Sequence, residues 1–171
     1  MKKSFLGSAL AIMLTFGIAP IGSADAAAKG VLATFEGQTI DLSKGWGDAK
    51  ACITDGTTTQ CFRSETEMQS APSTQIATLA TGCIPSVMLY SGTYFTGLAL
   101  NLTASNSVIA LSGYGFDNIT SSYGIGYCNA SFYDGLNKST AQYPGPTNAY
   151  ASATVMVSGW DNRISSVYIA P

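Results

Sequence analysis

The sequence predicts an all-β sandwich preceded by a small α+β segment, on the evidence of three features. Short β-type runs separated by turn residues fill the second half of the chain, residues 83–171. A unit of about 44 residues occurs twice in that half. No amphipathic helical pattern of useful length interrupts it. Two β units of this size can each bury one apolar face against the other.

The first 26 of the 171 residues have the pattern of a secretory signal peptide. Lys2 and Lys3 are followed by the apolar run Leu6–Ile21 and by Ala24-Asp25-Ala26, which fits a cleavage site. No later stretch is long and apolar enough to cross a bilayer. We therefore expect a secreted, extracellular protein.

Residues 27–80 are expected to form a small N-terminal segment that ends in a linker. Residues 31–35 and 38–42 resemble two short strands, and Ser64 to Glu67 fits a capping box that opens a short helix. Residues 69–82 are rich in Ser, Thr and Ala, as a loose connection would be. The segment is too small for a core of its own without a disulfide, so it either depends on one or packs on the rest.

The four cysteines, an even number in an exported chain, predict two disulfides. Four cysteines allow three pairings. We favour Cys52–Cys61, because the residues between them read as a hairpin with an Asp-Gly turn. Cys83–Cys128 then follows by elimination and closes a long loop.

The composition argues against most catalytic and nucleic-acid-binding classes. The chain contains no histidine, the commonest general base and zinc ligand, and only 11% of its residues are charged. Its net charge of −2 provides no basic surface for nucleic acid. We therefore expect a non-enzymatic monomer that binds neither nucleic acid nor membrane.

Two sequence patterns mark the repeat. Asp117-Asn118-Ile119-Thr120-Ser121-Ser122 recurs 44 residues later as Asp161-Asn162-Arg163-Ile164-Ser165-Ser166. Leu89-Tyr90-Ser91-Gly92 recurs 43 residues later as Phe132-Tyr133-Asp134-Gly135. Two features that recur at nearly the same spacing indicate a duplicated unit.

These residues resemble the signature of the βγ-crystallin family, in particular its microbial, calcium-binding members. The Asp/Asn-Asp/Asn-x-x-Ser/Thr-Ser signature is matched twice, and the run from Tyr90 to Gly97 is similar to the family's aromatic corner with one extra residue. The second corner, Tyr133 to Gly145, has a longer loop and departs further. The resemblance covers residues 81–171, as one sandwich domain of two Greek-key motifs at about 83–127 and 128–171.

The resemblance also implies two Ca²⁺ sites, and oxygen-bearing side chains suit that ion. One site would use the Ile119 carbonyl, the Ser121 hydroxyl and Asp134. The other would use the Arg163 carbonyl, the Ser165 hydroxyl and Ser91. Asp117 and Asp161 would bind directly or through water, and Asn118 and Asn162 would brace the loops. Because Asp134 can bring a negative charge and Ser91 cannot, the Asp134 site is expected to bind more tightly.

Two alternatives stay open. The Asp-Asn-x-x-Ser-Ser turn can brace a β corner without binding a metal. In place of a calcium-stabilised protein, the chain can be a secreted crystallin-fold peptidase inhibitor or antimicrobial toxin, whose partner is a secreted protease or a cell-surface component. An inhibitor needs an exposed loop, and the candidate is Leu136 to Ala149.

Overall fold

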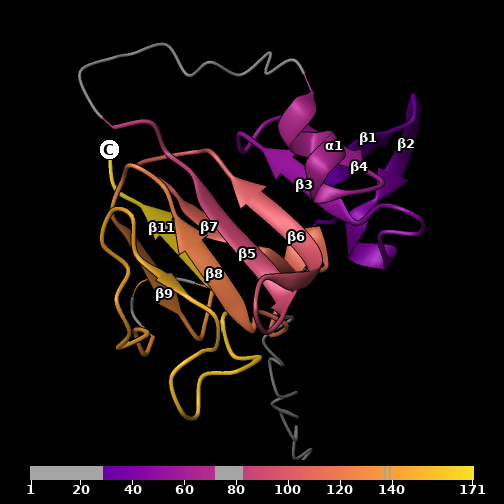
Figure 1. The fold of residues 1–171 in the computed structure, drawn as a ribbon. Coiled ribbons are helices and arrows are strands. Elements are labelled where there is room, and N and C mark those ends of the chain that lie inside the picture. The colour runs from indigo at the N-terminus through magenta and orange to yellow at the C-terminus, as the bar shows by residue number, and fades with distance from the viewer. Residues whose placement is uncertain (1–28, 72–82, 137, 139) are drawn as a thin grey trace, which may run out of the picture.

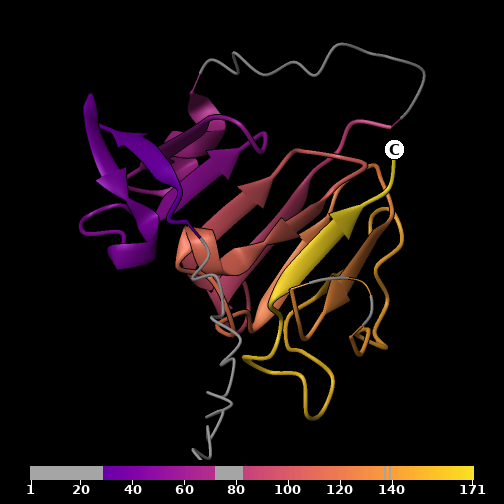
Figure 2. The same ribbon diagram turned by 180° about the vertical axis from the view of Figure 1, so that it is seen from behind.

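The computed structural model describes residues 29–71, 83–136, 138 and 140–171. The expected signal peptide and most of the expected linker therefore lie outside the described residues. Figures 1 and 2 show two packed sheets, with the N-terminal segment at one side of the larger sheet. Among the described residues, no helix has the length and apolar character needed to span a membrane.

The N-terminal segment has the two strands, the hairpin and the short helix expected from its sequence, and also a 3-10 helix that the sequence does not predict. They are β1 (Leu32–Phe35), β2 (Gln38–Asp41), the 3-10 helix η1 (Leu42–Lys44), β3 (Ala51–Thr54), β4 (Thr59–Phe62) and α1 (Glu65–Ser70). Ser64 is the N-cap of this helix, since its Oγ accepts a hydrogen bond from the Glu67 amide at 3.1 Å, which is one half of the predicted capping box. The Glu67 carboxylate accepts the Arg63 amide at 2.9 Å in place of the Ser64 amide. The Cys52–Cys61 disulfide joins directly opposite residues of β3 and β4, as the hairpin predicts.

The rest of the described chain is β-structure with one turn of 3-10 helix. Its elements are β5 (Val87–Gly92), β6 (Thr96–Leu102), β7 (Val108–Ala110), η2 (Leu111–Tyr114), β8 (Ser122–Ile125), β9 (Ala130–Tyr133), β10 (Ser152–Ala153) and β11 (Ser166–Ile169). The larger sheet has the order β10-β8-β5-β6-β3-β4-β1-β2, and the smaller one has the order β7-β11-β9.

The two repeats exchange strands, which is the arrangement of paired Greek keys. β7 of the first repeat pairs with β11 of the second, and β10 of the second pairs with β8 of the first. A register shift between Tyr90 and Gly92 accommodates the extra residue of the first aromatic corner. In the second corner, the longer loop leaves a single bridge, Tyr133 to Gln142, in place of a strand. The predicted all-β fold class is confirmed.

The core lies between the two sheets and is apolar and aromatic. Tyr123, from the larger sheet, packs edge-on against Phe132, from the smaller sheet, with ring centroids 4.9 Å apart. Leu89 and Val167 are fully buried beside them in the same core cluster. The disulfide Cys83–Cys128, the second of the expected pairs, joins the start of the first repeat to the start of the second.

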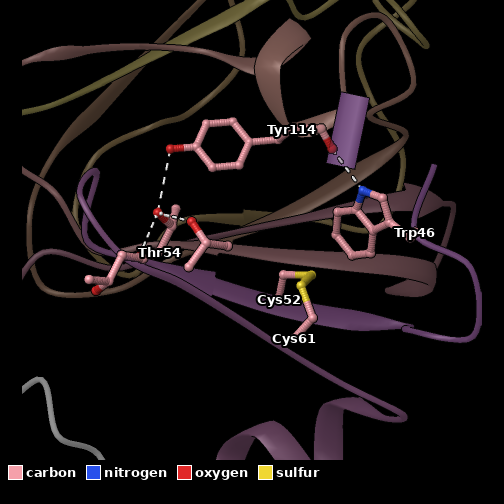
Figure 3. Close-up of a disulfide and its surroundings, with 7 residues drawn as sticks. Trp46, Cys52, Thr54, Cys61 and Tyr114 are labelled. Atoms are coloured by element: carbon pink, nitrogen blue, oxygen red, sulfur yellow. Dashed lines mark hydrogen bonds between the residues drawn. A yellow bond between two sulfur atoms is a disulfide. The ribbon is translucent and has the colours of Figure 1, made fainter. Parts of the chain in front are cut away.

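The N-terminal segment shares both the sheet and the core of the repeats. β3 pairs in parallel with β6 over four residue pairs, so the segment extends the larger sheet beyond its β6 edge. The buried Trp46 indole donates to the Tyr114 carbonyl at 2.7 Å (Figure 3). On the outer face of the sheet, Met68 of α1 packs with Tyr90 in a second, smaller core cluster. The segment is therefore bound to the sandwich by backbone pairing and by burial.

Candidate metal centre

The two Asp-Asn-x-x-Ser-Ser motifs adopt the same turn. Asn118 and Asn162 both have φ of 55°, a left-handed conformation that asparagine tolerates better than most residues. In each motif the side-chain amide of the asparagine donates to the carboxylate of the preceding aspartate, at 3.2 Å in the first motif and 3.4 Å in the second. The left-handed backbone conformation therefore explains why asparagine occupies the second position of both motifs.

The two motifs clamp one another across the domain. The backbone N–H of Asn118 donates to the Ile164 carbonyl and the backbone N–H of Asn162 donates to the Thr120 carbonyl, both at 3.0 Å. The buried hydroxyls follow the same cross-over. Ser165 Oγ donates to Asn118 Oδ1 at 3.2 Å, and Ser121 Oγ donates to Asn162 Oδ1 at 3.3 Å. Turns that lie 44 residues apart in the sequence therefore form one paired structure.

Each motif is also tied to the first strand of its own repeat. The Ser121 amide donates to the Tyr90 carbonyl at 2.9 Å, which brings Ser121 beside Ser91. The Ser165 amide donates to the Tyr133 carbonyl at 2.8 Å, which brings Ser165 beside Asp134. The last serine of each motif closes the same corner: Ser122 Oγ bonds the Gly92 carbonyl and Ser166 Oγ the Gly135 carbonyl, each at 2.6 Å.

These contacts group the candidate residues differently from the expectation. From the sequence, Ser121 is expected to share a site with Asp134, and Ser165 is expected to share one with Ser91. The hydrogen bonds instead bring Ser165 together with Asn118 and Asp134, and they bring Ser121 together with Asn162 and Ser91. The reason is the clamp: each hydroxyl faces the turn of the opposite motif, and only the folded pair of repeats determines that crossing.

The Arg163 side chain makes the two halves unequal. Its guanidinium Nη2 lies 2.7 Å from Asp134 Oδ2, and it lies over the Trp160 ring at 4.7 Å from the centroid. In the first repeat, the residue equivalent to Asp134 is Ser91, whose hydroxyl accepts the Leu98 amide at 2.8 Å. The sequence predicts a role only for the Arg163 carbonyl. The ion pair joins residues that lie 29 positions apart in the chain, so no local pattern reveals it.

One carboxylate oxygen at the clamp lacks a partner. Asp117 Oδ1 is buried without a hydrogen bond, as are Thr120 Oγ1 in the same motif and Ser112 Oγ nearby in sequence. Buried polar atoms are nearly always satisfied, so a buried anionic oxygen in this position suits a bound cation. The clamp residues offer hydroxyl, amide, carboxylate and carbonyl oxygens, which are the donors that Ca²⁺ prefers. No group of three or more His, Cys, Asp or Glu side chains gathers among the described residues.

No family model and no curated protein matches the chain. Several solved structures are similar to it. A βγ-crystallin from Ciona intestinalis is 22% identical, with a TM-score of 0.42 over 49% of this chain and 98% of its own. An archaeal βγ-crystallin is 18% identical, with a TM-score of 0.39 over 50% and 96%. A βγ-crystallin domain from Flavobacterium johnsoniae is 19% identical, with a TM-score of 0.41 over 48% and 91%.

The strand exchange between the repeats and the pair of clamped motifs are seen directly in this structure and do not depend on the similar solved structures. They occupy the part of the described chain that carries the repeated sequence, residues 83–136, 138 and 140–171. Together they make this part of the protein a β-sandwich of two Greek-key motifs, the fold that the resemblance of its motifs predicts.

Proposed function

We propose that the protein is secreted and binds Ca²⁺ at its two clamped motifs, and that the ion stabilises the fold without any catalytic role. The observation that supports this best is the buried, unpartnered Asp117 Oδ1 beside the interlocked turns. The chain has two disulfides, and the cysteines of the hairpin disulfide are buried. Disulfides form and persist in an oxidising compartment, as expected for a secreted protein.

The ligand sets follow the contacts of the clamp. Each site would take the aspartate, the asparagine and the third-position carbonyl from one motif, the serine hydroxyl from the other motif, and the residue beside that serine. The first set is Asp117, Asn118, the Ile119 carbonyl, Ser165 and Asp134. The second set is Asp161, Asn162, the Arg163 carbonyl, Ser121 and Ser91.

The two sites should differ in affinity. The first set contains two carboxylates, Asp117 and Asp134, and the second contains one, Asp161. Calcium affinity rises with the number of charged ligands. On ligand charge alone, the first site should therefore bind Ca²⁺ more tightly than the second. Arg163 opposes this, because its pair with Asp134 must be released before that carboxylate can serve the ion. Affinities in the range of extracellular modules, about 10⁻⁴ to 10⁻³ M, are expected.

Thermal melting with and without calcium tests the proposal. An ion that binds only the folded state at a concentration 10 to 100 times its Kd stabilises it by about 1.4–2.7 kcal/mol. For a chain of this length that corresponds to a rise in Tm of about 3–10 °C. The protein is melted in 10 mM CaCl₂, in 10 mM MgCl₂ and in EGTA. A calcium-induced shift of less than about one degree overturns the proposal.

Matched serine variants test the grouping of the ligands. Ser165→Ala should weaken the first site and Ser121→Ala the second, so that calorimetric titration loses a different binding event in each. Ser158→Ala, at an exposed position close to the second motif, is the control and should leave both events intact. Identical isotherms for all three variants and the parent protein would show that the hydroxyls bind no ion.

The alternative of an inhibitor or toxin requires the loop Leu136 to Ala149 to be exposed and free to bind a partner. The second half of this loop is anchored: Tyr143 is buried, its hydroxyl accepts the Val157 amide at 3.3 Å, and the Pro146 carbonyl accepts the Tyr123 hydroxyl. A loop held in this way offers little free extended chain to a protease. No observation favours this alternative over calcium binding.

A further inference from the structure

The N-terminal segment contacts the stretch of chain that leads into the first Asp-Asn-x-x-Ser-Ser motif. We call this stretch, residues 113–116, the approach loop; it includes the end of η2. The Val31 amide donates to the Gly113 carbonyl at 2.8 Å, and the buried Trp46 indole donates to the Tyr114 carbonyl at 2.7 Å (Figure 3). Two successive carbonyls of the approach loop are therefore held by donors that lie far from it in the sequence.

The other two residues of the approach loop pack against the same segment. The Phe116 ring is fully buried, and its centroid lies 5.7 Å from that of the Trp46 ring. Gly115 has φ of 62°, and a Cβ built on it would collide with the Leu42 carbonyl oxygen. Only glycine allows this close approach, since any side chain would push the N-terminal segment away. All four residues of the approach loop are therefore in contact with the N-terminal segment.

The equivalent loop of the second repeat packs within its own repeat. The counterpart of Gly115, 44 residues later, is Gly159. It is also left-handed, at φ of 80°, but no described atom beyond its chain neighbours lies within 4 Å of a Cβ built on it. The counterpart of Phe116 is Trp160, whose ring packs edge-on against Tyr143 with centroids 5.5 Å apart. The described contacts are thus unequal, because the N-terminal segment holds the approach to the first motif alone.

The approach loop leads directly to a proposed calcium ligand. Asp117 follows Phe116 in the chain, and its buried Oδ1 has no hydrogen-bond partner among the described residues. The Phe116 amide donates to the Leu111 carbonyl at 3.0 Å, and the Leu111 amide donates to the Ser165 carbonyl at 2.9 Å. The loop is therefore also joined to the serine whose hydroxyl would serve the same site. A ligand whose backbone is already fixed loses less conformational entropy when an ion binds.

We propose that the N-terminal segment regulates calcium affinity at the first site, with Trp46 as the positioning residue, and leaves the second site unaffected. This inference rests on the proposed binding of Ca²⁺ and concerns its regulation. Coupling between two binding events is reciprocal, so the ion must strengthen the docking of the segment by the same factor by which docking strengthens ion binding. Couplings of this kind are typically about 5–150-fold. Calcium affinity and segment docking are therefore two separate measurements of one coupling.

Calorimetric titration of two variants measures the effect on affinity. The first-site event is the one that Ser165→Ala weakens. Trp46→Phe keeps an aromatic ring but removes the indole donor, so this event should weaken by at least about fivefold. Gly115→Ala should weaken it by about tenfold or more, because the new Cβ displaces the segment. The second-site event should match that of the parent protein in both variants.

Gly159→Ala is the matched control for backbone strain. It places alanine in the same left-handed conformation as Gly115→Ala, but the new Cβ meets no part of the N-terminal segment among the described residues. It should leave the first site unchanged, and any loss at the second site should be smaller than the loss that Gly115→Ala causes at the first. If Gly115→Ala fails to fold, Trp46→Phe, which removes one hydrogen bond, decides the question.

Hydrogen exchange of the Trp46 indole proton measures the docking. This proton is bonded to the Tyr114 carbonyl and exchanges when the segment opens, so NMR should show its exchange slowed at least about fivefold by calcium. The slowing should persist in Ser121→Ala, which keeps the first site, and disappear in Ser165→Ala. Equal slowing in both variants would mean that calcium acts only through global stability, and would contradict the proposal.

Two calorimetric outcomes also overturn the proposal while calcium binding stands. One is a first-site affinity equal to that of the parent in Trp46→Phe. The other is a loss at the second site in Gly159→Ala as large as the loss at the first site in Gly115→Ala, since backbone strain then explains both. A parent protein that shows no calcium-binding event refutes the ion sites themselves, so the two failures can be told apart.

Discussion

Replacing Arg163 with glutamine separates the two roles proposed for this residue, whose carbonyl would serve one calcium site while its guanidinium neutralises a ligand of the other. The side chains of Arg163 and Asp134 are 47% and 19% exposed, so their ion pair at 2.7 Å is partly screened by solvent. Pairs of this kind contribute about 0.2–1 kcal/mol. The contact of the guanidinium with the Trp160 ring adds about 0.5–1 kcal/mol.

Arg163→Gln should therefore change two quantities in opposite directions. In EGTA the free energy of unfolding should fall by about 0.7–2 kcal/mol, which lowers the Tm by about 1–8 °C. In calcium the first site should bind more tightly, by at most about fivefold, because the ion no longer competes with the guanidinium for Asp134. Melting in both buffers measures the first quantity, and calorimetric titration measures the second.

Arg63→Gln is the matched control. Arg63 pairs with Glu36 and lies over the Phe35 ring at 5.7 Å, so it makes the same two kinds of contact in the N-terminal segment. Its loss should lower stability slightly and leave the calcium isotherm unchanged. If Arg163→Gln leaves the isotherm unchanged as well, Asp134 is no ligand. If it weakens calcium binding, the guanidinium supports the site and does not oppose it.

Three further predictions concern the fold. Trp46→Phe should destabilise by about 1–3 kcal/mol, because it leaves the buried Tyr114 carbonyl without its donor, and chemical denaturation should still show one transition; two transitions would mean that the N-terminal segment unfolds separately. Replacing Cys83 and Cys128 with alanine opens a loop with a sequence separation of 45, which should cost about 4 kcal/mol by loop entropy, measured by urea unfolding; a loss under about 1 kcal/mol would contradict that account. Hydrogen bonds from the Thr58 amide and its neighbours lower the pKa of Asp55 from 3.8 to about 2, so the carboxylate stabilises the fold above pH 4 and this contribution is lost as the pH falls toward 2. Asp55→Ala should therefore be less stable than the parent at pH 7, with the difference narrowing between about pH 4 and pH 2; a constant difference would refute the assignment.

Local patterns predicted most of the individual elements correctly. The strands near residues 31–42, the hairpin between Cys52 and Cys61 and the helix after Ser64 each depend on signals within a few residues, such as turn chemistry and capping. The favoured disulfide pairing is present for the same reason, since one pair belongs to a hairpin and leaves only one partner for each remaining cysteine. The departure of the second corner was also visible from its longer loop.

The grouping of the candidate ligands could not be predicted in the same way. Ser121 lies two residues from Ile119 in the sequence, yet its hydroxyl faces Asn162 of the other repeat. The left-handed turns at Asn118 and Asn162 interlock, so each hydroxyl reaches the opposite turn. Contacts of this kind depend on how the two folded repeats dock, and no local sequence pattern determines that docking.

The repeated β units of the second half, and the oxygen-bearing residues that recur in them, follow from the amino-acid sequence, because side-chain period, turn residues and repeat spacing are local properties. The parallel pairing of β3 with β6, the ion pair of Arg163 with Asp134 and the contact of the Ser121 hydroxyl with Asn162 depend instead on the folded domain. These are pairings between segments far apart in the chain. Their partners are chosen by the burial and backbone hydrogen bonding of the whole domain, since many registers satisfy the local preferences equally well.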